Sequence, residues 1–187
     1  MMKRLFAALK IPPGEIALAN YYRLKKSLQQ ERIKWVQPDN FHLTLKFFGG
    51  TPVEEIERIS KILMPLAEQQ APIYTHLSKT GVFGSRYAPR VIWFGFGEEK
   101  TLSELGNRVL DELDKGGFEK DRQNFVPHLT IARIKQVFDK KHFQDALRDV
   151  AQFEPEEFCI REMTLYESIL KPEGPVYVPL QNYPFGK

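Results

Sequence analysis

One tetrapeptide pattern occurs twice in this chain of 187 residues, as His42-Leu43-Thr44-Leu45 and as His128-Leu129-Thr130-Ile131. Polar and apolar residues alternate through each copy, which is the pattern of a half-buried strand. Because successive side chains of a strand point to opposite faces, the histidine and threonine share one face and the two aliphatic residues share the other. Each copy therefore predicts a strand anchored in a core, with an imidazole and a hydroxyl on the opposite side.

The segments around the two copies follow the same order in both halves of the chain: helix, strand, helix, strand, strand. A unit repeated in this way packs naturally as two related lobes. We therefore expect residues 1–187 to form a single α+β domain of two duplicated lobes. After a first strand at 1–10, the predicted segments are 15–30, 41–48, 51–70, 73–83 and 91–96 in the first half, and 101–115, 126–134, 139–150, 158–170 and 175–180 in the second.

Capping residues predict where three of the helices begin. Thr51 with Glu54, and Thr101 with Glu104, have the spacing of a capping box, in which a hydroxyl and a carboxylate satisfy backbone N–H groups at a helix start. Asp139 precedes a third amphipathic segment and is predicted to be its N-cap.

Composition excludes several classes of protein. Hydrophobic residues make up 42% and charged residues 27%, which is typical of a globular domain, and no apolar run is long enough to span a bilayer. A net charge of +3 suits an anionic ligand but is too small for a protein that coats nucleic acid. The single cysteine, Cys159, lies in an apolar stretch, so we expect an inert buried thiol, a reducing environment and a cytoplasmic location.

Two histidines and two threonines on facing lobes suit the hydrolysis of a phosphodiester. A neutral imidazole can take a proton from the attacking water while an imidazolium gives one to the leaving oxygen, and histidine adopts both forms near neutral pH. The hydroxyls of Thr44 and Thr130, together with a cationic side chain, can hold the non-bridging oxygens. Such a site needs no covalent nucleophile and no cofactor.

Metal binding is the main chemical alternative for His42 and His128. A catalytic zinc site usually has three protein ligands, often from a helical H-x-x-x-H pair and a carboxylate, and neither histidine has such neighbours in sequence. The chain also has no nucleophile-elbow sequence and no P-loop. We expect no metal, and we expect His76 and His142, which have no partner copy, to be structural or solvated.

Segments outside the paired motif carry a resemblance that runs along the whole chain. They are Arg4-Leu5-Phe6-Ala7-Ala8, residues 40–49, Pro89-Arg90-Val91-Ile92-Trp93 and residues 125–133. With the paired motif, the chain resembles the two-histidine phosphoesterase superfamily, and within it the bacterial and archaeal RNA 2′,3′-cyclic phosphodiesterases, historically called 2′-5′ RNA ligases. Phe48 departs from the family pattern, because many relatives have leucine there.

The resemblance implies a bilobal, pseudo-symmetric α+β fold with two antiparallel sheets facing a central cleft and helices outside. It also implies that RNA ending in a 2′,3′-cyclic phosphate is opened to a 2′-phosphate, with His42 as proton donor to the 3′ oxygen and His128 as proton acceptor. The two motifs are too alike for the residues alone to assign these roles. Reversal of the reaction would give weak 2′-5′ ligation.

Several neighbouring residues are candidates for substrate contacts. Arg133 matches a family arginine expected to bind phosphate, but strict alternation puts it opposite His128, so that a β-bulge would be needed, and an ion pair is the alternative. Phe47 and Phe48 are candidates for stacking on a base, although Phe47 shares the face of the aliphatic anchors, which predicts core packing. The loop residues Arg86, Tyr87 and Arg90 either meet the RNA backbone or are simply solvated.

Two other functions stay open at this point. The same chemistry would suit a small cyclic nucleotide or a cyclic phosphate sugar, or the chain would only bind nucleotides or RNA ends. Binding alone would favour Arg and Lys over two titrating imidazoles. We expect a monomer that acts on RNA ends and does not associate with membranes.

Overall fold

The chain folds into two antiparallel sheets in this computed structural model, which describes residues 1–85, 87–97, 99–120 and 124–187. A four-stranded sheet has the order β3-β1-β8-β9, and a five-stranded sheet has the order β2-β6-β5-β4-β7. The elements in chain order are β1 (Met2–Lys10), α1 (Glu15–Ser27), β2 (Arg32–Trp35), the 3₁₀ helix η1 (Pro38–Asn40), β3 (His42–Pro52), α2 (Glu55–Glu68), β4 (Ile73–Gly84), β5 (Pro89–Phe96), α3 (Glu99–Lys115), β6 (Leu129–Gln136), α4 (Lys140–Arg148), β7 (Gln152–Ile160), β8 (Glu162–Lys171) and β9 (Gly174–Pro184).

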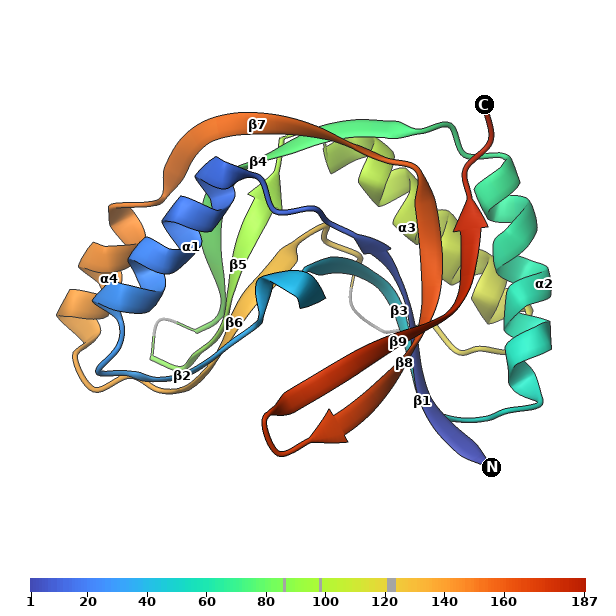
Figure 1. Ribbon diagram of the computed structural model, residues 1–187, viewed down its shortest axis with the longest axis horizontal. Coiled ribbons are helices and arrows are strands. Elements are labelled where there is room, and N and C mark those ends of the chain that lie inside the picture. The colour runs from blue at the N-terminus through green and yellow to red at the C-terminus, as the bar shows by residue number, and fades with distance from the viewer. Residues whose placement is uncertain (86, 98, 121–123) are drawn as a thin grey trace.

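Helices lie on the outer side of each sheet (Figure 1). α2 and α3 pack against the four-stranded sheet, whereas α1 and α4 lie beside the five-stranded sheet. The predicted α+β fold of two antiparallel sheets with outer helices is confirmed. No helix within the described ranges is both long and apolar enough to cross a membrane.

Each sheet combines strands from both halves of the chain. β1 and β3 share a sheet with β8 and β9 from the C-terminal end, joined by the pairing of β1 with β8, and β2, β4 and β5 share the other sheet with β6 and β7. The register shows the mixing directly, because Ala8 of β1 lies opposite Thr44 on one side and Thr164 on the other. The sheets therefore do not correspond to the two halves of the sequence, and the duplication of one unit stays a prediction.

The predicted capping boxes at Thr51 and Thr101 are wrong. Thr51 lies inside β3, where it pairs with Lys3 of β1 and is buried, and the helix that follows has Glu54 at its N-cap with no side-chain hydrogen bond. Thr101 lies within α3, which starts at Glu99. Extended pairing with β1 keeps the first threonine in the strand, a long-range effect that outweighs local capping preference.

The N-cap predicted at Asp139 is confirmed. Its side chain accepts a hydrogen bond from the backbone N–H of His142 at 2.9 Å. Glu31 also accepts hydrogen bonds from the backbone N–H groups of Phe138 and Asp139, so that two carboxylates satisfy the chain where α4 begins.

The C-terminal end has three strands where the pattern predicted two. The segment predicted as one strand over 158–170 is divided at Arg161 between β7, which pairs with β4, and β8, which pairs with β1 and β9. The apolar alternation continues across the break, so the sequence carries no local sign that the chain changes sheets there. β6 begins at Leu129, three residues later than predicted, so that His128 lies immediately before the strand.

Candidate active site

The two sheets each provide one of the paired histidines. His42 is the first residue of β3 in the four-stranded sheet, and His128 immediately precedes β6 in the five-stranded sheet. β3 and β6 contact each other, and the charge of a protonated His128 lowers the pKa of His42. The fold therefore brings together two imidazoles that are far apart in sequence.

Both imidazoles make the same hydrogen bond to the backbone. His42 Nδ1 lies 2.6 Å from the carbonyl oxygen of Asn40, and His128 Nδ1 lies 2.7 Å from the carbonyl oxygen of Val126. A carbonyl can only accept, so each Nδ1 must carry the hydrogen, and Nε2 of the neutral ring then has a free lone pair. The carbonyl two residues before each histidine thus fixes the tautomer and leaves Nε2 for chemistry.

Aromatic rings pack around His42. The centroid of its ring lies 5.0 Å from that of Phe6 and 5.1 Å from that of Tyr177, whose ring is perpendicular to it. Phe6 is almost completely buried and also stacks on Tyr166 at 5.1 Å. Neighbouring rings on β1, β8 and β9 therefore hold the imidazole in place.

His128 rests against a different ring. Its centroid lies 4.8 Å from that of Phe83 of β4, edge to face, and Phe83 in turn lies 5.1 Å from Trp93 of β5. Phe83 and Tyr177 were not identified as site residues from the sequence, because each meets its histidine only through strand pairing across the whole fold. Aromatic residues at alternate strand positions are too common to mark them.

Burial is the main influence on the acidity of both imidazoles. It brings the pKa of His42 down to about 4; the bond to the Asn40 carbonyl opposes this shift, and the charges of Arg133 and His128 add to it. The pKa of His128 is also lowered, first by burial and then by Arg133, against the bond to the Val126 carbonyl. Both rings are therefore neutral near pH 7 in the ligand-free protein.

A β-bulge interrupts β6 within the second motif. Thr130 pairs with Trp93, but Ala132 pairs with the next residue of β5, Ile92, so that Ile131 is the extra residue. Ile131 and Ala132 are both buried although they are adjacent. The bulge shifts the side chains that follow it, as far as a second irregularity at Lys135, to the opposite face from the one that strict alternation predicts.

This bulge puts Arg133 on the side of the histidines. Arg133 is exposed, and its charge lowers the pKa of His42, of His128 and of Tyr177. A single guanidinium thus acts on both imidazoles and on a phenol. A phosphate contact by Arg133 required a β-bulge between His128 and Arg133, and β6 has one.

β3 has a bulge at the same position of the first motif. Ala8 pairs with Thr44, whereas Ala7 pairs with Lys46, so that Leu45 is the extra residue. Leu45 and Lys46 are both buried, in the same way as their counterparts in β6. The two motifs therefore share a backbone irregularity as well as a sequence.

The bulge in β3 corrects two expectations. Lys46, predicted to share the face of His42, is buried and donates from Nζ to the carbonyl oxygen of Glu119 at 2.6 Å. Phe47, predicted to pack in the core, is 50% exposed and lies 5.8 Å from the ring of Phe6. Phe48 provides the core contact instead, with its ring 5.5 Å from that of Phe118.

Thr44 and Thr130 are half-buried on the same strand faces as the histidines. Within the described part of the chain, neither hydroxyl forms a hydrogen bond with another protein group. Both can therefore donate to a bound anion. Tyr177 adds a further hydroxyl. Its pKa is raised by burial, and the nearby charges of Arg133 and Arg4 oppose this shift.

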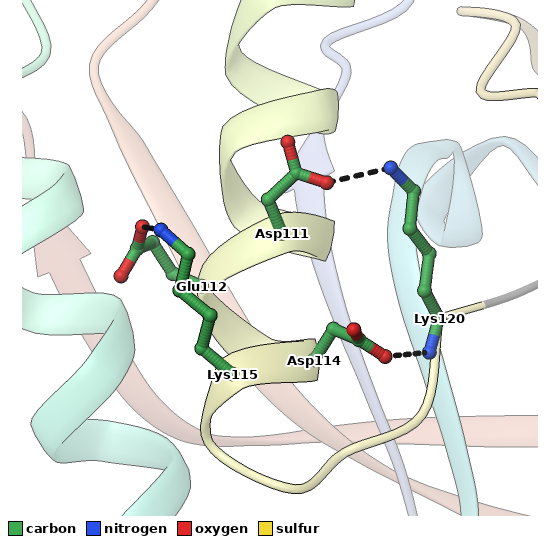
Figure 2. Close-up of polar contacts among 5 residues, drawn as sticks. All are labelled: Asp111, Glu112, Asp114, Lys115 and Lys120. Carbon is green, nitrogen blue, oxygen red and sulfur yellow. Dashed lines mark hydrogen bonds and ion pairs between the residues drawn. The ribbon is translucent and has the colours of Figure 1, made fainter.

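Side-chain contacts fasten the chain shortly after α3, at Glu119 and Lys120. Figure 2 shows Lys120, whose ammonium group bonds to Asp111 at 2.6 Å and whose backbone N–H bonds to Asp114 at 2.8 Å. Lys46 holds the neighbouring carbonyl of Glu119 from the side of β3. The buried lysine therefore ties the first motif to the approach of the second.

Phe125 fixes the end of this approach. Its ring lies so close to Gly106 of α3 that a Cβ at that glycine would come within 2.2 Å of Cε1. The close contact leaves Val126 placed to accept from His128. Tyr21 does the corresponding work before the first motif, since it donates to the carbonyl of Val36 at 2.9 Å and packs on Phe41.

A cavity of about 250 Å³ adjoins His42 on the four-stranded sheet. Tyr166 and Tyr177 form part of its wall. The side chains in the wall that can donate or accept hydrogen bonds include Lys10, Asp39, Glu162 and Asn182. The cavity is large enough for a nucleobase and has polar groups that can recognise its edge.

The remaining candidate residues lie elsewhere. His76 is half-buried against Gly97, and the exposed His142 donates from Nε2 to the carbonyl of Ser27 at 2.9 Å. Cys159 is a free, half-buried thiol on β7. Among the residues that the structure describes, no group of three or more His, Cys, Asp or Glu side chains is arranged to hold a metal ion.

The predicted loop contacts are only partly described. Arg86 lies outside the described residues. Tyr87 is exposed in the turn between β4 and β5, whereas Arg90, predicted to be in the loop, is exposed at the start of β5.

Two solved structures share this architecture. TT0787 of Thermus thermophilus is 26% identical and superimposes with a TM-score of 0.74 over 98% of this chain and 99% of its own. E. coli LigT complexed with 3′-AMP is 22% identical, with a TM-score of 0.72 over all of both chains. The latter likeness supports the fold, two antiparallel sheets with outer helices.

Comparison of sequences shows the family to which the chain belongs. The family described as LigT like Phosphoesterase matches residues 11–93 and 97–177. A protein of Methanocaldococcus jannaschii is 32% identical over 183 residues, which are 96% of this chain and 99% of that protein, and one of Aquifex aeolicus is 32% identical over 88% of each. Both are named RNA 2′,3′-cyclic phosphodiesterase. The chain belongs to the LigT-like phosphoesterase family, as its motifs predicted.

Proposed function

We propose that this chain hydrolyses the terminal 2′,3′-cyclic phosphate of RNA to a 2′-phosphate, with His42 and His128 as acid and base. The observation that carries the proposal is the pair of imidazoles, one from each sheet, which make matching Nδ1 bonds and whose Nε2 atoms bond to no protein group among the described residues. The names of the relatives support the substrate.

The reaction needs one proton to move at each histidine. Nε2 of His128 accepts a proton from water as the water oxygen attacks phosphorus, and Nε2–H of His42 gives a proton to the 3′ oxygen as its bond to phosphorus breaks. The products are a 2′-phosphate and a 3′-hydroxyl. Exchange of one proton at each ring with solvent restores the starting state.

Protonation of His42 has to be coupled to binding of the substrate. Its pKa of about 4 in the free protein leaves too little imidazolium at neutral pH for an acid catalyst. A bound phosphate anion favours the charged ring and partly offsets the repulsion from Arg133, so the pKa of His42 rises on binding. Protonation coupled to binding favours the reactive form only when a phosphate is present.

Four groups around the rings suit the phosphate. Arg133 supplies a full positive charge, and the hydroxyls of Thr44, Thr130 and Tyr177 supply donors. Donors held by strands in a partly buried site stabilise added negative charge without having to reorient.

The direct test uses a labelled RNA oligomer with a cyclic-phosphate end, incubated in EDTA. We expect the wild type to form a 2′-monophosphate, and His42→Ala and His128→Ala to lose roughly 10²- to 10⁴-fold in rate. His142→Ala is a matched control, because that ring is exposed on α4 and should leave the rate unchanged. Loss of activity in chelator that zinc restores would contradict a metal-independent mechanism.

A small cyclic nucleotide is the second candidate substrate, and the cavity of about 250 Å³ beside His42 favours it because that space suits one base. Comparing kcat/KM on a mononucleotide 2′,3′-cyclic phosphate and on an oligomer separates the two. Tight binding with no product after long incubation would instead indicate a binding module. Weak 2′-5′ ligation, a monomeric state and a cytoplasmic location stay predictions.

A further inference from the structure

A second, larger cavity of about 580 Å³ lies at the far end of the five-stranded sheet. It is bounded by the turn between β4 and β5, by the end of β6 and by α4. Apolar side chains from both the sheet and the helix line it, among them Val82, Ile134, Phe143 and Leu147. Neither catalytic histidine belongs to it.

Positive charge surrounds this apolar floor. Arg90, Lys135 and Lys140 line the cavity and are exposed, and no Asp or Glu is among the lining residues described. Arg90 and Lys135 form no ion pair within the described ranges. Lys140 lies 5.9 Å from the ring centroid of Tyr87, which is itself 81% exposed.

The carboxylates at the start of α4 bind backbone N–H groups and do not line the cavity. Asp139 caps α4 by accepting from the backbone N–H of His142, and Glu31 accepts from the backbone N–H groups of Phe138 and Asp139. Both carboxylates are committed to the start of the helix. The cavity is an apolar depression whose described lining carries cations and no carboxylate, which suits bases joined by phosphates.

The cavity and the catalytic residues lie at the same end of the β4–β5 strand pair but on opposite faces of the sheet, because Val82 pairs with Ile92, whereas Phe83 pairs with Val91, the partner of Arg133. Lys135, two positions after Arg133 on β6, is the extra residue of a second β-bulge, between the pairs Ile33–Ile134 and Arg32–Gln136. Val91 pairs with Arg133, and Arg90 precedes it on β5. An RNA strand from the phosphate at Arg133 would therefore reach Arg90 and Lys135 by passing round the end of the sheet at the turn between β4 and β5.

We propose that this cavity binds the RNA strand on the 5′ side of the cyclic phosphate, with Arg90 and Lys135 on backbone phosphates and a base over the apolar floor. The proposal rests on the proposed function of the catalytic site. It explains how an enzyme with a reaction centre for one phosphate can favour an RNA end over a free nucleotide.

The test measures the double variant Arg90→Gln/Lys135→Gln on two substrates, a mononucleotide 2′,3′-cyclic phosphate and an oligomer of several nucleotides with the same end. We expect the oligomer's kcat/KM to fall about tenfold and the mononucleotide's to stay within about twofold of wild type. The salt dependence of the oligomer reaction should weaken, its logarithmic slope losing about 0.7 for each lost phosphate contact. Lys61→Gln/Lys100→Gln, which removes two exposed charges from α2 and α3, is the matched control and should change neither substrate.

Two outcomes would overturn the proposal. One is a wild type that turns over the oligomer no faster than the mononucleotide, and the other is a double variant that keeps both the oligomer preference and the salt slope. If the wild type turned over neither substrate, the proposed function itself would be contradicted. The mononucleotide arm therefore separates failure of the second cavity from failure of the catalytic site.

Discussion

The segments that begin at His42 and at His128 have the same local structure but carry different side chains at their sixth residue. From each histidine onward, buried and exposed residues follow the same order, and each segment has a bulge at the fourth residue of its motif. The bulge brings the sixth residue back toward the histidine, and this residue is Phe47 in β3 and Arg133 in β6. The shared part provides two equivalent imidazoles, and the differing residue gives one side an aromatic surface and the other a cation.

The environments of the two rings differ as well. His42 is enclosed by Phe6 and Tyr177, and its pKa falls to about 4, whereas His128 meets Phe83. Enclosure next to Arg133 makes the charged form of His42 depend on a bound anion. Near-identical motifs can in this way take opposite roles in one reaction.

The largest expected effect tests this division of roles. His42→Ala and His128→Ala should each lose roughly 10²- to 10⁴-fold on the natural substrate. With sulfur in place of the bridging 3′ oxygen the leaving group needs no proton, so His42→Ala should recover to within about tenfold of wild type and His128→Ala should not. Single-turnover rates on the two substrates provide the measurement, and equal recovery of both variants would reverse or abolish the assignment.

Removal of the cation that distinguishes β6 should have the next largest effect. Arg133→Gln should lower kcat/KM about 10²-fold if, as we propose, its charge stabilises the phosphate in the transition state. It should also raise the pKa of both histidines in the free protein, since the charge of Arg133 lowers them. Arg148→Gln, which changes an exposed arginine of α4, serves as the control. An active Arg133→Gln with unchanged histidine pKa values would place the guanidinium away from the reaction.

The enclosure of His42 predicts a pH dependence of stability. Its pKa is lower in the folded chain than the ordinary value of 6.5, so the unfolded chain binds the proton more readily. The contribution of the neutral ring is complete above about pH 6.5 and is lost as the pH falls toward 4, to the extent of at most roughly 3 kcal/mol. Unfolding by urea between pH 7 and pH 4 should show a steeper loss of free energy in the wild type than in His42→Asn. Parallel curves for the two proteins would argue against a buried neutral imidazole.

Substitution of Phe47, which has the position in β3 that Arg133 has in β6, should have the smallest effect. Phe47 is half exposed, so Phe47→Ala should leave the free energy of unfolding nearly unchanged while kcat/KM on RNA falls about tenfold through lost stacking. Phe48→Ala, its matched control, should instead lower the stability by about 2 kcal/mol, because that ring packs on Phe118 in the core. A Phe47→Ala variant that loses stability but keeps its activity would contradict a role of Phe47 in stacking on RNA.

Sequence patterns predicted the two motif strands, the helices and the family, because these depend on local periodicity and on residue type, whereas the chemistry of the site stays a prediction. They failed at Lys46 and Phe47, since Leu45 carries no mark of a bulge and strict alternation then assigns both side chains to the wrong face. They also joined β7 to β8, where the alternation continues while the chain passes to the other sheet. The contact of Tyr177 with His42 arises from strand order in the sheet, which no local pattern encodes.

The most direct measurement of the central claim is an NMR titration of the histidine rings, alone and with a nucleoside 2′-phosphate, the product of the proposed reaction. The account predicts that His42 in the free protein titrates near pH 4, that its pKa rises when the 2′-phosphate binds, and that Nδ1 of both rings keeps its hydrogen throughout. If His42 and His128 titrate independently near their ordinary value and neither responds to the nucleotide, the two imidazoles do not act on one phosphate.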